Sequence, residues 1–516
     1  MESMREACTA SHVRSAERPI LEVERGFSGG LMHRAAWALA ASARRELRSD
    51  GLRPAEASVV GLIGRHSNGG DTLHAMALLA GRGASVTAIA FGPVHEGGLA
   101  ALRAAGGRVL AIDADAPGEQ VWLGDAVAEA FGADLLLDGL LGIGGTGGLA
   151  GTHARVVELL GGLFDAVGAA GAVPRVIAVD VPSGIGVDDG TVPGPVLRAD
   201  RTVTFGAVKP GLLLPPAAAF AGEIEIVDLG LGPNLAELGE PAVRRLEDDD
   251  VAALWPVPGH DDDKYRRGVV GVVAGSTGYP GAAMLSVAGA LGAGCGMVRY
   301  LGPRRATEAV IAAHPEVVAA EGRVQAWVVG PGVAGDRQRE RTRAVLAGLG
   351  DLPAVVDAGA LAELPARVGP AVVLTPHAGE LATLLRARGL DVERAAVEAE
   401  PLRWAREAQR LTGATVLLKG ATTVVVGVDG EVFSQAEAPP WLATAGAGDV
   451  LAGVLGALLC GSAAAVVEHP ALAASLAAAA AFVHGRAAHV ANPGGPVSAS
   501  AVAAAVPGVI AGILNR

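Results

Sequence analysis

The chain has 516 residues and a formal net charge of −13 at pH 7. This length exceeds one ordinary hydrophobic core, so two or three domains are expected. The acidic balance argues against a general nucleic-acid binder, although glycine loops and helix ends can still bind anionic small molecules.

Cysteine use and apolar runs point to a cytoplasmic protein. No metal-ligand spacing relates Cys8, Cys295 and Cys460, and three cysteines cannot form a disulfide framework. Residues 1–20 lack the apolar stretch of a signal peptide. The longest apolar run, 471–483, is too short to span a bilayer and predicts a buried helix. We therefore expect neither a membrane partner nor a nucleic-acid partner.

In the first half of the chain, short β-rich runs alternate with helical stretches. Strands are predicted at 58–64, 85–91, 108–113, 134–142 and 175–182, and helices at 72–81, 120–131 and 152–169. Apolar strands separated by helices indicate a parallel sheet covered on both faces, so a Rossmann-like three-layer αβα domain is expected. Two later runs, 201–205 and 223–230, are expected to close this unit at one edge.

The stretch 231–268 is richer in charge, proline and glycine, and we interpret it as a linker. The domain boundary is placed near residue 240, which gives domains of 1–240 and 241–516. A second α/β run follows, with strands predicted at 269–276, 326–332, 354–359, 371–377 and 415–420. The segment 424–433 resembles a hairpin around Asp429-Gly430.

Five of the loops after these second-half strands carry glycine or polar residues, at the sheet edge where open α/β sheets bind ligands. A glycine-rich stretch, ATAGAGDVLAG, follows at 443–453. Gly446 and Gly448 let a ligand approach the main chain. The run 450–460 predicts a helix, so Asp449 would lie in its first turn, beside N–H groups that attract anions.

GAGD before a helix is typical of the ribokinase-like superfamily. Together with GSTGYPGA, VVGPG, VVDAGAL, LTPHAGE and VLLKGATT, it resembles the NAD(P)H-hydrate dehydratases over roughly residues 250–516. Ala447 stands where that family commonly has threonine, but alanine is usual elsewhere in the superfamily. The resemblance implies a ribokinase-like α/β domain that uses ADP, with Mg²⁺, to dehydrate the S form of hydrated NADH or NADPH, releasing AMP and phosphate.

The same resemblance implies roles for individual residues. The hydrate would contact Ala282, Gly332, His377 and Asp449, and the adenine nucleotide would contact Lys419, Gly420, Ala421, Thr422, Thr423 and Gly448. Asp449 is expected to be the catalytic base, and the N–H groups of Gly446, Ala447, Gly448 and Asp449 to form an anion hole. Taken singly, Asp449 could be an ordinary helix-start carboxylate, His377 a turn histidine and Lys419 a solvated lysine.

In the first half, oxygen-bearing side chains follow three predicted strands. Asn68 and Asp71 flank the tight turn expected at Gly69-Gly70, Asp138 precedes a glycine-rich loop, and Asp180 and Ser183 lie in VDVPSG. Such a set suits a hard monovalent or divalent cation. The glycine loop could admit a pyrophosphate through its backbone N–H groups.

The order of these motifs, followed by TVTFGAVKPG at 202–211, resembles the NAD(P)H-hydrate epimerase domain over roughly residues 15–230. Residues 31–40 look like that family's first helix. The resemblance implies that potassium binds to Asn68, Asp138 and Ser183. It implies hydrate contacts from Ser67, Asn68, Gly69, Gly70, Asp71, Gly142, Ile143, Gly144, Gly145, Thr146, Gly147, Gly148 and Asp180. Asp180 is the expected catalytic acid–base group, with Lys209 a weaker candidate.

One loop departs from the epimerase pattern. The family usually has GNNGGDG, whereas residues 66–72 read HSNGGDT, so His66 would crowd the approach to phosphate or contribute a new donor. Together the two halves resemble the bifunctional NAD(P)H-hydrate repair family, and we expect a homo-oligomer with hydrated NADH or NADPH and ADP as partners. The alternative is a ribokinase-like small-molecule kinase whose first half is a degenerate, non-catalytic binding domain.

Overall fold

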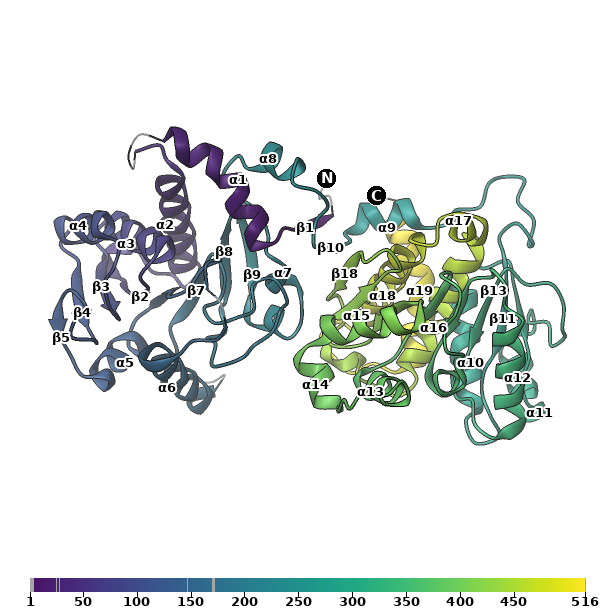
Figure 1. Cartoon of the computed structure of the whole chain (residues 1–516). Coiled ribbons are helices and arrows are strands. Elements are labelled where there is room, and N and C mark those ends of the chain that lie inside the picture. The colour runs from purple at the N-terminus through teal and green to yellow at the C-terminus, as the bar shows by residue number, and fades with distance from the viewer. Residues whose placement is uncertain (1–3, 25, 27, 146, 169–171, 516) are drawn as a thin grey trace. The chain divides into compact units, whose positions relative to one another are not determined.

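The computed structural model describes residues 4–24, 26, 28–145, 147–168 and 172–515 (Figure 1). The chain divides into two compact units. The amino-terminal unit is Glu6–Ala242, and the carboxy-terminal unit is Val243–Arg516 with Met1–Arg5. Within the described ranges, no helix combines the length and the apolarity needed to cross a bilayer.

The amino-terminal unit is built on an eight-stranded parallel sheet in the order β5-β4-β3-β2-β6-β7-β8-β9. Its strands are β2 (Ser58–Ile63), β3 (Ser85–Ala90), β4 (Arg108–Ala111), β5 (Glu119–Gln120), β6 (Leu135–Gly139), β7 (Arg175–Val179), β8 (Arg201–Phe205) and β9 (Glu223–Val227). The predicted closing strands, β8 and β9, do lie at one edge.

Helices cover both faces of this sheet, which confirms the predicted three layers (Figure 1). Val59 and Val60 are adjacent in β2 and therefore point to opposite faces. Val59 belongs to a core with α1 (Ala10–Val23), α2 (Leu31–Ser49), α3 (Ser67–Ala80) and α4 (Glu96–Ala104). Val60 belongs to a core with α5 (Leu123–Phe131) and α6 (Gly151–Val167). Two short helices, α7 (Pro210–Leu213) and α8 (Gly232–Ala236), complete the unit.

Two helices of this unit differ from the sequence prediction. Helix α3 begins at Ser67 rather than at residue 72, so Gly69 lies inside it and not in a tight turn. The glycine is needed there because a Cβ atom would lie 2.0 Å from the carbonyl oxygen of Gly64. Helix α1 precedes the segment 31–40, which resembles the first helix of the epimerase family, and it lies where the sequence predicts no helix. Its internal Pro19 and mixed composition concealed it, although Thr9 caps it by accepting the N–H of His12.

The carboxy-terminal unit contains a sheet in the order β1-β10-β18-β17-β16-β15-β14-β13-β11-β12. Its strands are β1 (Arg5–Ala7), β10 (Val243–Arg245), β11 (Val269–Val273), β12 (Met297–Tyr300), β13 (Ala326–Val329), β14 (Ala354–Val356), β15 (Val372–Leu374), β16 (Thr415–Leu418), β17 (Thr423–Val426) and β18 (Val432–Gln435). Strands β11 to β16 pair in parallel, and β17 and β18 form the predicted antiparallel hairpin.

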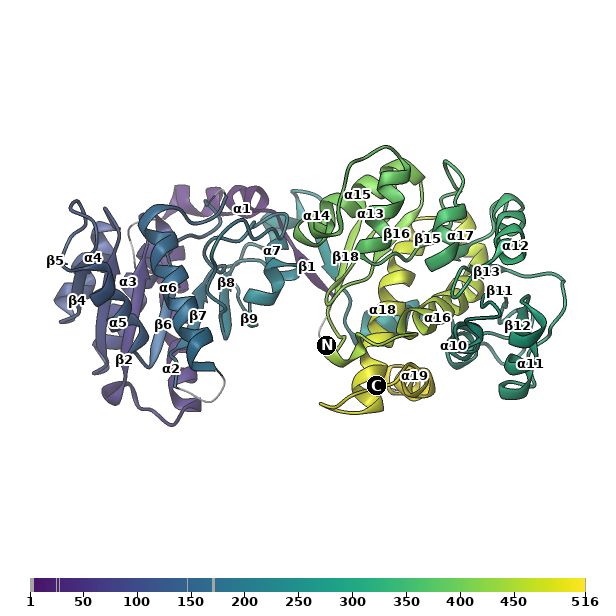
Figure 2. The same ribbon diagram turned by 90° about the horizontal axis from the view of Figure 1, so that it is seen from below.

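Four long helices share one apolar core with this sheet: α10 (Pro280–Gly292), α16 (Ala447–Gly461), α18 (Leu472–Ala491) and α19 (Ala499–Leu514). The expected buried helix at 471–483 is the first part of α18. The other helices are α9 (Asp248–Leu254), α11 (Arg304–Ala313), α12 (Asp336–Ala347), α13 (Ala378–Ala387), α14 (Arg394–Ala399), α15 (Pro401–Thr412) and α17 (Ala463–Glu468). Figure 2 shows α13 and α15 on the side of the sheet away from α18 and α19.

Part of the predicted linker is folded, which corrects that interpretation. Strand β10 pairs with β18, and helix α9 follows it with Val251 buried in the core of the carboxy-terminal unit. The three aspartates 248–250, which lie within the predicted linker, occupy the first turn of α9, where the helix dipole favours anions. Within the predicted linker 231–268, residues 237–242 and 255–268 form the longer stretches without a helix or strand.

Helices α10 and α16 approach each other through glycine. A Cβ atom on Gly289 would lie 2.4 Å from the carbonyl oxygen of Val450, and one on Gly453 would lie 2.1 Å from that of Ser286. The two backbones are therefore in contact, which fixes the amino-terminal half of α16 against the later turns of α10.

We predict that Gly289→Ala lowers the free energy of unfolding by about 1–3 kcal/mol, because the new methyl group forces these backbones apart. The matched change is Gly508→Ala on α19, which is exposed and has no atom within 4 Å of a new Cβ. That change should be neutral or stabilising by up to about 1 kcal/mol. Urea unfolding of both variants measures the difference, and equal effects would contradict the packing argument.

Candidate active sites

The predicted loops of the carboxy-terminal unit meet at one edge of its sheet. In the strand order β16-β15-β14-β13-β11, the residues after each strand end are Lys419, His377, Asp357, Gly332 and Ser276. Helix α16, which begins with Ala447-Gly448-Asp449, contacts β11, β13 and β14. The row of loops and the start of a helix therefore belong to one site, as expected for an open α/β sheet.

Lys419 joins the carboxylates of this site. Its Nζ lies 2.7 Å from Asp357 Oδ1 and 3.7 Å from Glu380 Oε2. The Asp357 side chain is only 2% exposed. Burial opposes the charge of Lys419, but Asp357, Glu380 and Asp449 outweigh it and raise the pKa of Lys419. The lysine therefore stays cationic at the sheet edge rather than being simply solvated.

The backbone of the GAGD stretch, residues 446–449, lies close to Lys419. Gly446 precedes α16 with a φ of 87°, which glycine adopts without strain. A Cβ atom on Gly448 would lie 3.2 Å from Lys419 Nζ, so glycine leaves room for the ammonium group. Burial raises the pKa of Asp449 to about 6, with a further contribution from Asp357 and an opposing one from Lys419. Asp449 is thus a stronger base than an exposed aspartate.

Ala282 and Gly332 are neighbours, since a Cβ atom on Gly332 would lie 2.6 Å from that of Ala282. His377 caps α13: its Nδ1 accepts the N–H groups of Gly379 at 3.0 Å and Glu380 at 3.2 Å. A neutral ring in this arrangement carries its proton on Nε2, which lies on a half-exposed side chain. The predicted nucleotide-contacting residues 420–422 form the turn between β16 and β17.

Three residues of this site were not among the sequence candidates. Asp357 and Glu380 lay within quoted motifs, but only the strand order reveals that both meet Lys419. His484 comes from α18, far along the chain, and its ring hydrogen-bonds the backbone of Ala447. Burial lowers the pKa of His484 to about 4, and its Nε2 has no hydrogen-bond partner among the described residues. No local motif could have assigned it.

In the amino-terminal unit, the three residues assigned to potassium converge. The N–H of Ser183 donates to Asp138 Oδ2 at 2.8 Å, and a Cβ atom on Gly142 would lie 3.2 Å from Asn68 Cγ. Burial raises the pKa of Asp138. Asn68 Nδ2 is buried and lacks a partner in the part of the chain that the structure describes. Buried oxygen donors of this kind fit a hard cation, and an unsatisfied amide fits a missing polar ligand.

Asp180 is anchored through one of its two oxygens. Its Oδ1 accepts hydrogen bonds from Phe205 N at 3.2 Å, from Thr204 Oγ1 at 3.3 Å and from Lys209 Nζ in a short contact. Lys209 also donates to Thr204 Oγ1 at 3.0 Å and to Phe205 O at 2.8 Å, so all three ammonium protons can be used within the protein. Asp180 has a φ of 70°, a strained value for a residue other than glycine.

In the altered loop at 66–72, Thr72 is the changed residue whose side chain is buried within the unit. Thr72 Oγ1 donates to Asn68 O at 2.8 Å. Gly139 leaves space for the Thr72 hydroxyl, since a Cβ atom on Gly139 would lie 2.1 Å from Thr72 Oγ1. His66 and Ser67 are exposed at the start of α3, whereas Asp71 is buried. Of the glycine-rich loop 142–148, Thr146 lies outside the described residues.

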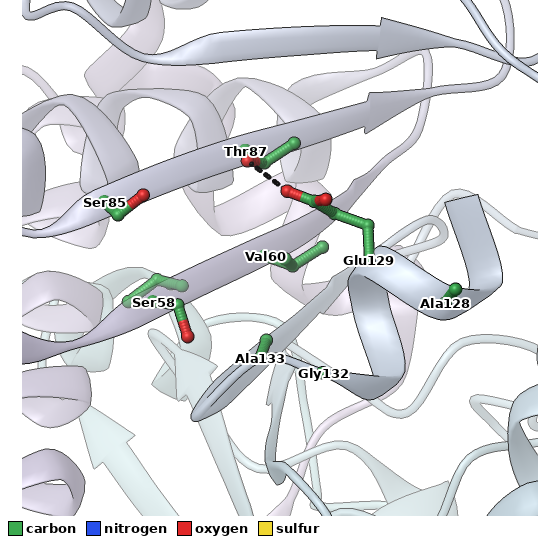
Figure 3. A pocket seen from close by; sticks show the side chains of 9 residues that line it. Ser58, Val60, Ser85, Thr87, Ala128, Glu129, Gly132 and Ala133 are labelled. Carbon is green, nitrogen blue, oxygen red and sulfur yellow. Dashed lines mark hydrogen bonds between the residues drawn. The ribbon is translucent and has the colours of Figure 1, made fainter. Parts of the chain in front are cut away.

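A pocket of about 210 Å³ lies away from both sets of residues (Figure 3). Ser58 and Ser85, which begin β2 and β3, line it, and Glu129 of α5 reaches across to accept a hydrogen bond from Thr87 at 2.9 Å. It therefore lies at the amino ends of the strands, opposite to the edge where α/β sheets bind ligands. None of the sequence candidates lines it, so we do not place function there.

Comparison with known proteins supports the family predicted for each half of the chain. The family model of the NAD(P)H-hydrate dehydratases matches residues 270–503, and that of the YjeF-related protein N-terminus matches residues 28–211. A solved ADP/ATP-dependent NAD(P)H-hydrate dehydratase from Bacillus subtilis, co-crystallised with ATP and Mg²⁺, is 26% identical. It covers 52% of this chain and 97% of its own, with a TM-score of 0.45.

Curated relatives match one unit or most of the chain. An NAD(P)H-hydrate epimerase from Clavibacter michiganensis is 43% identical over 43% of this chain and 89% of its own. A bifunctional NAD(P)H-hydrate repair enzyme from Mycobacterium tuberculosis is 42% identical over 88% of this chain and 89% of its own. With one relative spanning both units at this identity, the chain belongs to the bifunctional NAD(P)H-hydrate repair family.

Proposed function

We propose that this protein repairs hydrated nicotinamide cofactors in two steps. The amino-terminal unit interconverts the R and S forms of hydrated NADH or NADPH, and the carboxy-terminal unit uses ADP to dehydrate the S form, giving AMP and phosphate. The observation that carries the second step is Asp449, a carboxyl of raised pKa in the first turn of α16, beside the cationic Lys419.

The geometry suits phosphoryl transfer followed by elimination. A hydroxyl group is a poor leaving group, and transfer of the terminal phosphoryl group of ADP makes it a good one. Asp449 would accept the hydroxyl proton as the oxygen attacks phosphorus, while the N–H groups of 446–449 stabilise the phosphoryl oxygens. Lys419 would exchange its bond to Asp357 for a nucleotide phosphate. The hydrate would lie against Ala282, Gly332 and His377.

Metal ions enter the two units differently. The described residues hold no group of three or more His, Cys, Asp or Glu side chains able to bind a metal ion. This fits Mg²⁺ that arrives with nucleotide phosphates and keeps most of its water, where it would neutralise charge on the transferred group. Potassium would be held by Asn68, Asp138 and Ser183, where it would compensate the buried Asp138 carboxyl.

Asp180 is the group proposed to move protons in the epimerase unit. Lys209, Thr204 and Phe205 hold its Oδ1, which leaves Oδ2 for the substrate. Lys209 is a positioning residue in this account, because its own donors are engaged by the protein. Residues 67–71, 142–148 and Asp180 would contact the hydrate.

The test of the whole proposal is recovery of reduced-nicotinamide absorbance when the protein is mixed with S-hydrated NADH and ADP or ATP. We predict recovery that requires nucleotide. Absence of recovery with either nucleotide would contradict the proposal and favour a ribokinase-like kinase acting on another alcohol.

We predict that Asp449→Asn reduces dehydration of the S hydrate by at least about 10³-fold, because the attacking hydroxyl loses its base. Nucleotide binding, measured by calorimetry, should change little. Asp429→Asn in the exposed turn between β17 and β18 is the matched control and should be fully active. A turnover rate in Asp449→Asn close to that of the control would refute the role as base.

The pH dependence of the dehydratase should report Asp449. Its pKa is raised to about 6, so the base form and hence kcat/KM for the S hydrate should be lost as the pH falls below that value. Asp357→Asn removes a carboxylate that raises this pKa and should move the acid limb to lower pH. Asp351→Asn, exposed before the same strand, should leave it in place. An acid limb of kcat/KM at the wild-type pH in Asp357→Asn would contradict the electrostatic coupling between Asp357 and Asp449.

Pure R hydrate isolates the epimerase step. We predict that the wild-type protein converts R hydrate with ADP faster than spontaneous epimerisation allows, and that Asp180→Asn removes this advantage while S-hydrate turnover is retained. Potassium should accelerate the R reaction selectively. Recovery on R hydrate that never exceeds the spontaneous rate would show that the amino-terminal unit is not a working epimerase.

A further inference from the structure

Helix α1 is fixed against the amino-terminal unit by contacts from several elements. The N–H of Ala10 donates to Asp188 Oδ1 at 2.7 Å, and Asn234 Nδ2 donates to the carbonyl oxygen of Ala16 at 2.8 Å. Val13 and Ala16 are buried in the core that this helix shares with α2 and α3. The helix is therefore an integral part of the unit, although it lies before the segment 28–211 that the family model matches.

The exposed side of α1 reaches the proposed epimerase site. Arg14 Nη1 donates to the carbonyl oxygen of Ile143 at 2.9 Å and so ties the helix to the glycine-rich loop. Glu17 follows three residues later, and residues with this spacing lie on one side of a helix. Its carboxyl group is within electrostatic range of Asp180, Lys209 and Arg14, and also of the buried Asp71.

These carboxyl groups differ in what holds them. Asp180 is paired with the ammonium group of Lys209. Glu17 is partly exposed, and no hydrogen bond engages its carboxylate among the described residues. Burial and the neighbouring Asp180 raise the pKa of Glu17, with Lys209 and Arg14 opposing. Glu17 is thus suited to carry a proton beside the lysine-paired Asp180. Asn68, whose Nδ2 lacks a partner, lies one turn before Asp71 and marks the same region as a place for a ligand.

Epimerisation inverts the carbon that carries the hydroxyl group, and this requires two proton transfers. In one sequence, an acid protonates the hydroxyl, the C–O bond breaks, and the electron pair of the ring nitrogen forms a C=N bond as water leaves. Water then adds to the opposite face, forms the new C–O bond and gives its proton to a base. The sum is an isomerisation without net gain of protons or electrons.

We propose that Glu17 is a second catalytic acid–base group of the epimerase unit and acts together with Asp180 on the hydrated carbon. In the direction just described, Glu17 gives the proton to the leaving hydroxyl and Asp180 accepts the proton of the adding water. The reverse direction exchanges these roles. The inference rests on the proposed epimerase function and goes beyond it by assigning the partner of Asp180 to α1.

The test uses full-length Glu17→Gln with Glu22→Gln as the matched control, since Glu22 is exposed on the same helix. With R hydrate and ADP, Glu17→Gln should lower kcat on the order of 100-fold with little change in KM, whereas Glu22→Gln should match wild type. S-hydrate turnover should be unchanged in both. Glu17→Asp, which keeps the carboxyl, should recover part of the rate. Because Glu17 must be protonated to act as the acid, the wild-type rate on R hydrate should fall as the pH rises. The residual rate of Glu17→Gln should not show this fall.

Two results would overturn the inference: wild-type R-hydrate turnover in Glu17→Gln, or a loss accompanied by a lowered thermal midpoint, unchanged pH profile and no recovery in Glu17→Asp. The second would mean that Glu17 only supports the helix. Failure of the proposed function itself looks different, because wild-type protein would then not exceed spontaneous epimerisation of R hydrate.

Discussion

The carboxy-terminal unit depends on keeping one lysine and three carboxylates together at a sheet edge. Lys419 is bonded to Asp357, faces Glu380 and is covered by Gly448, whose missing side chain makes the approach possible. Burial and the charge of Asp357 raise the pKa of Asp449, with Lys419 opposing. Burial opposes the charge of Lys419, but the three carboxylates outweigh it and raise the pKa of that lysine. Glycine contacts between α10 and α16 hold the first turn of α16 in register with this cluster.

The amino-terminal unit also holds a catalytic candidate, Asp180, through an ion pair with a lysine, Lys209. A strained backbone at Asp180 and three donors on one of its oxygens fix the carboxylate, and Lys209 supplies the compensating charge. In both units a lysine is paired with an aspartate. In the carboxy-terminal unit this lysine also lies against Gly448 in the first turn of α16.

The sequence predicted the layers, most strands and the start of α16, because apolar runs and glycine motifs are local signals. It failed where local signals conflict with tertiary contacts. Pro19 hid α1, the composition of 231–268 suggested a linker although it contains α9, and Gly69 suggested a turn although it lies inside α3, packed against Gly64. Asp357, Glu380, His484 and Glu17 could not be assigned, because each meets its site through elements distant in the chain.

If the hydroxyl oxygen of the hydrate attacks phosphorus, that oxygen must leave with the phosphate. S-hydrated NADH labelled with ¹⁸O in its hydroxyl group is turned over with ADP, and the released phosphate is analysed by mass spectrometry. We expect one ¹⁸O atom in each phosphate. Label released as water, with unlabelled phosphate, would contradict it.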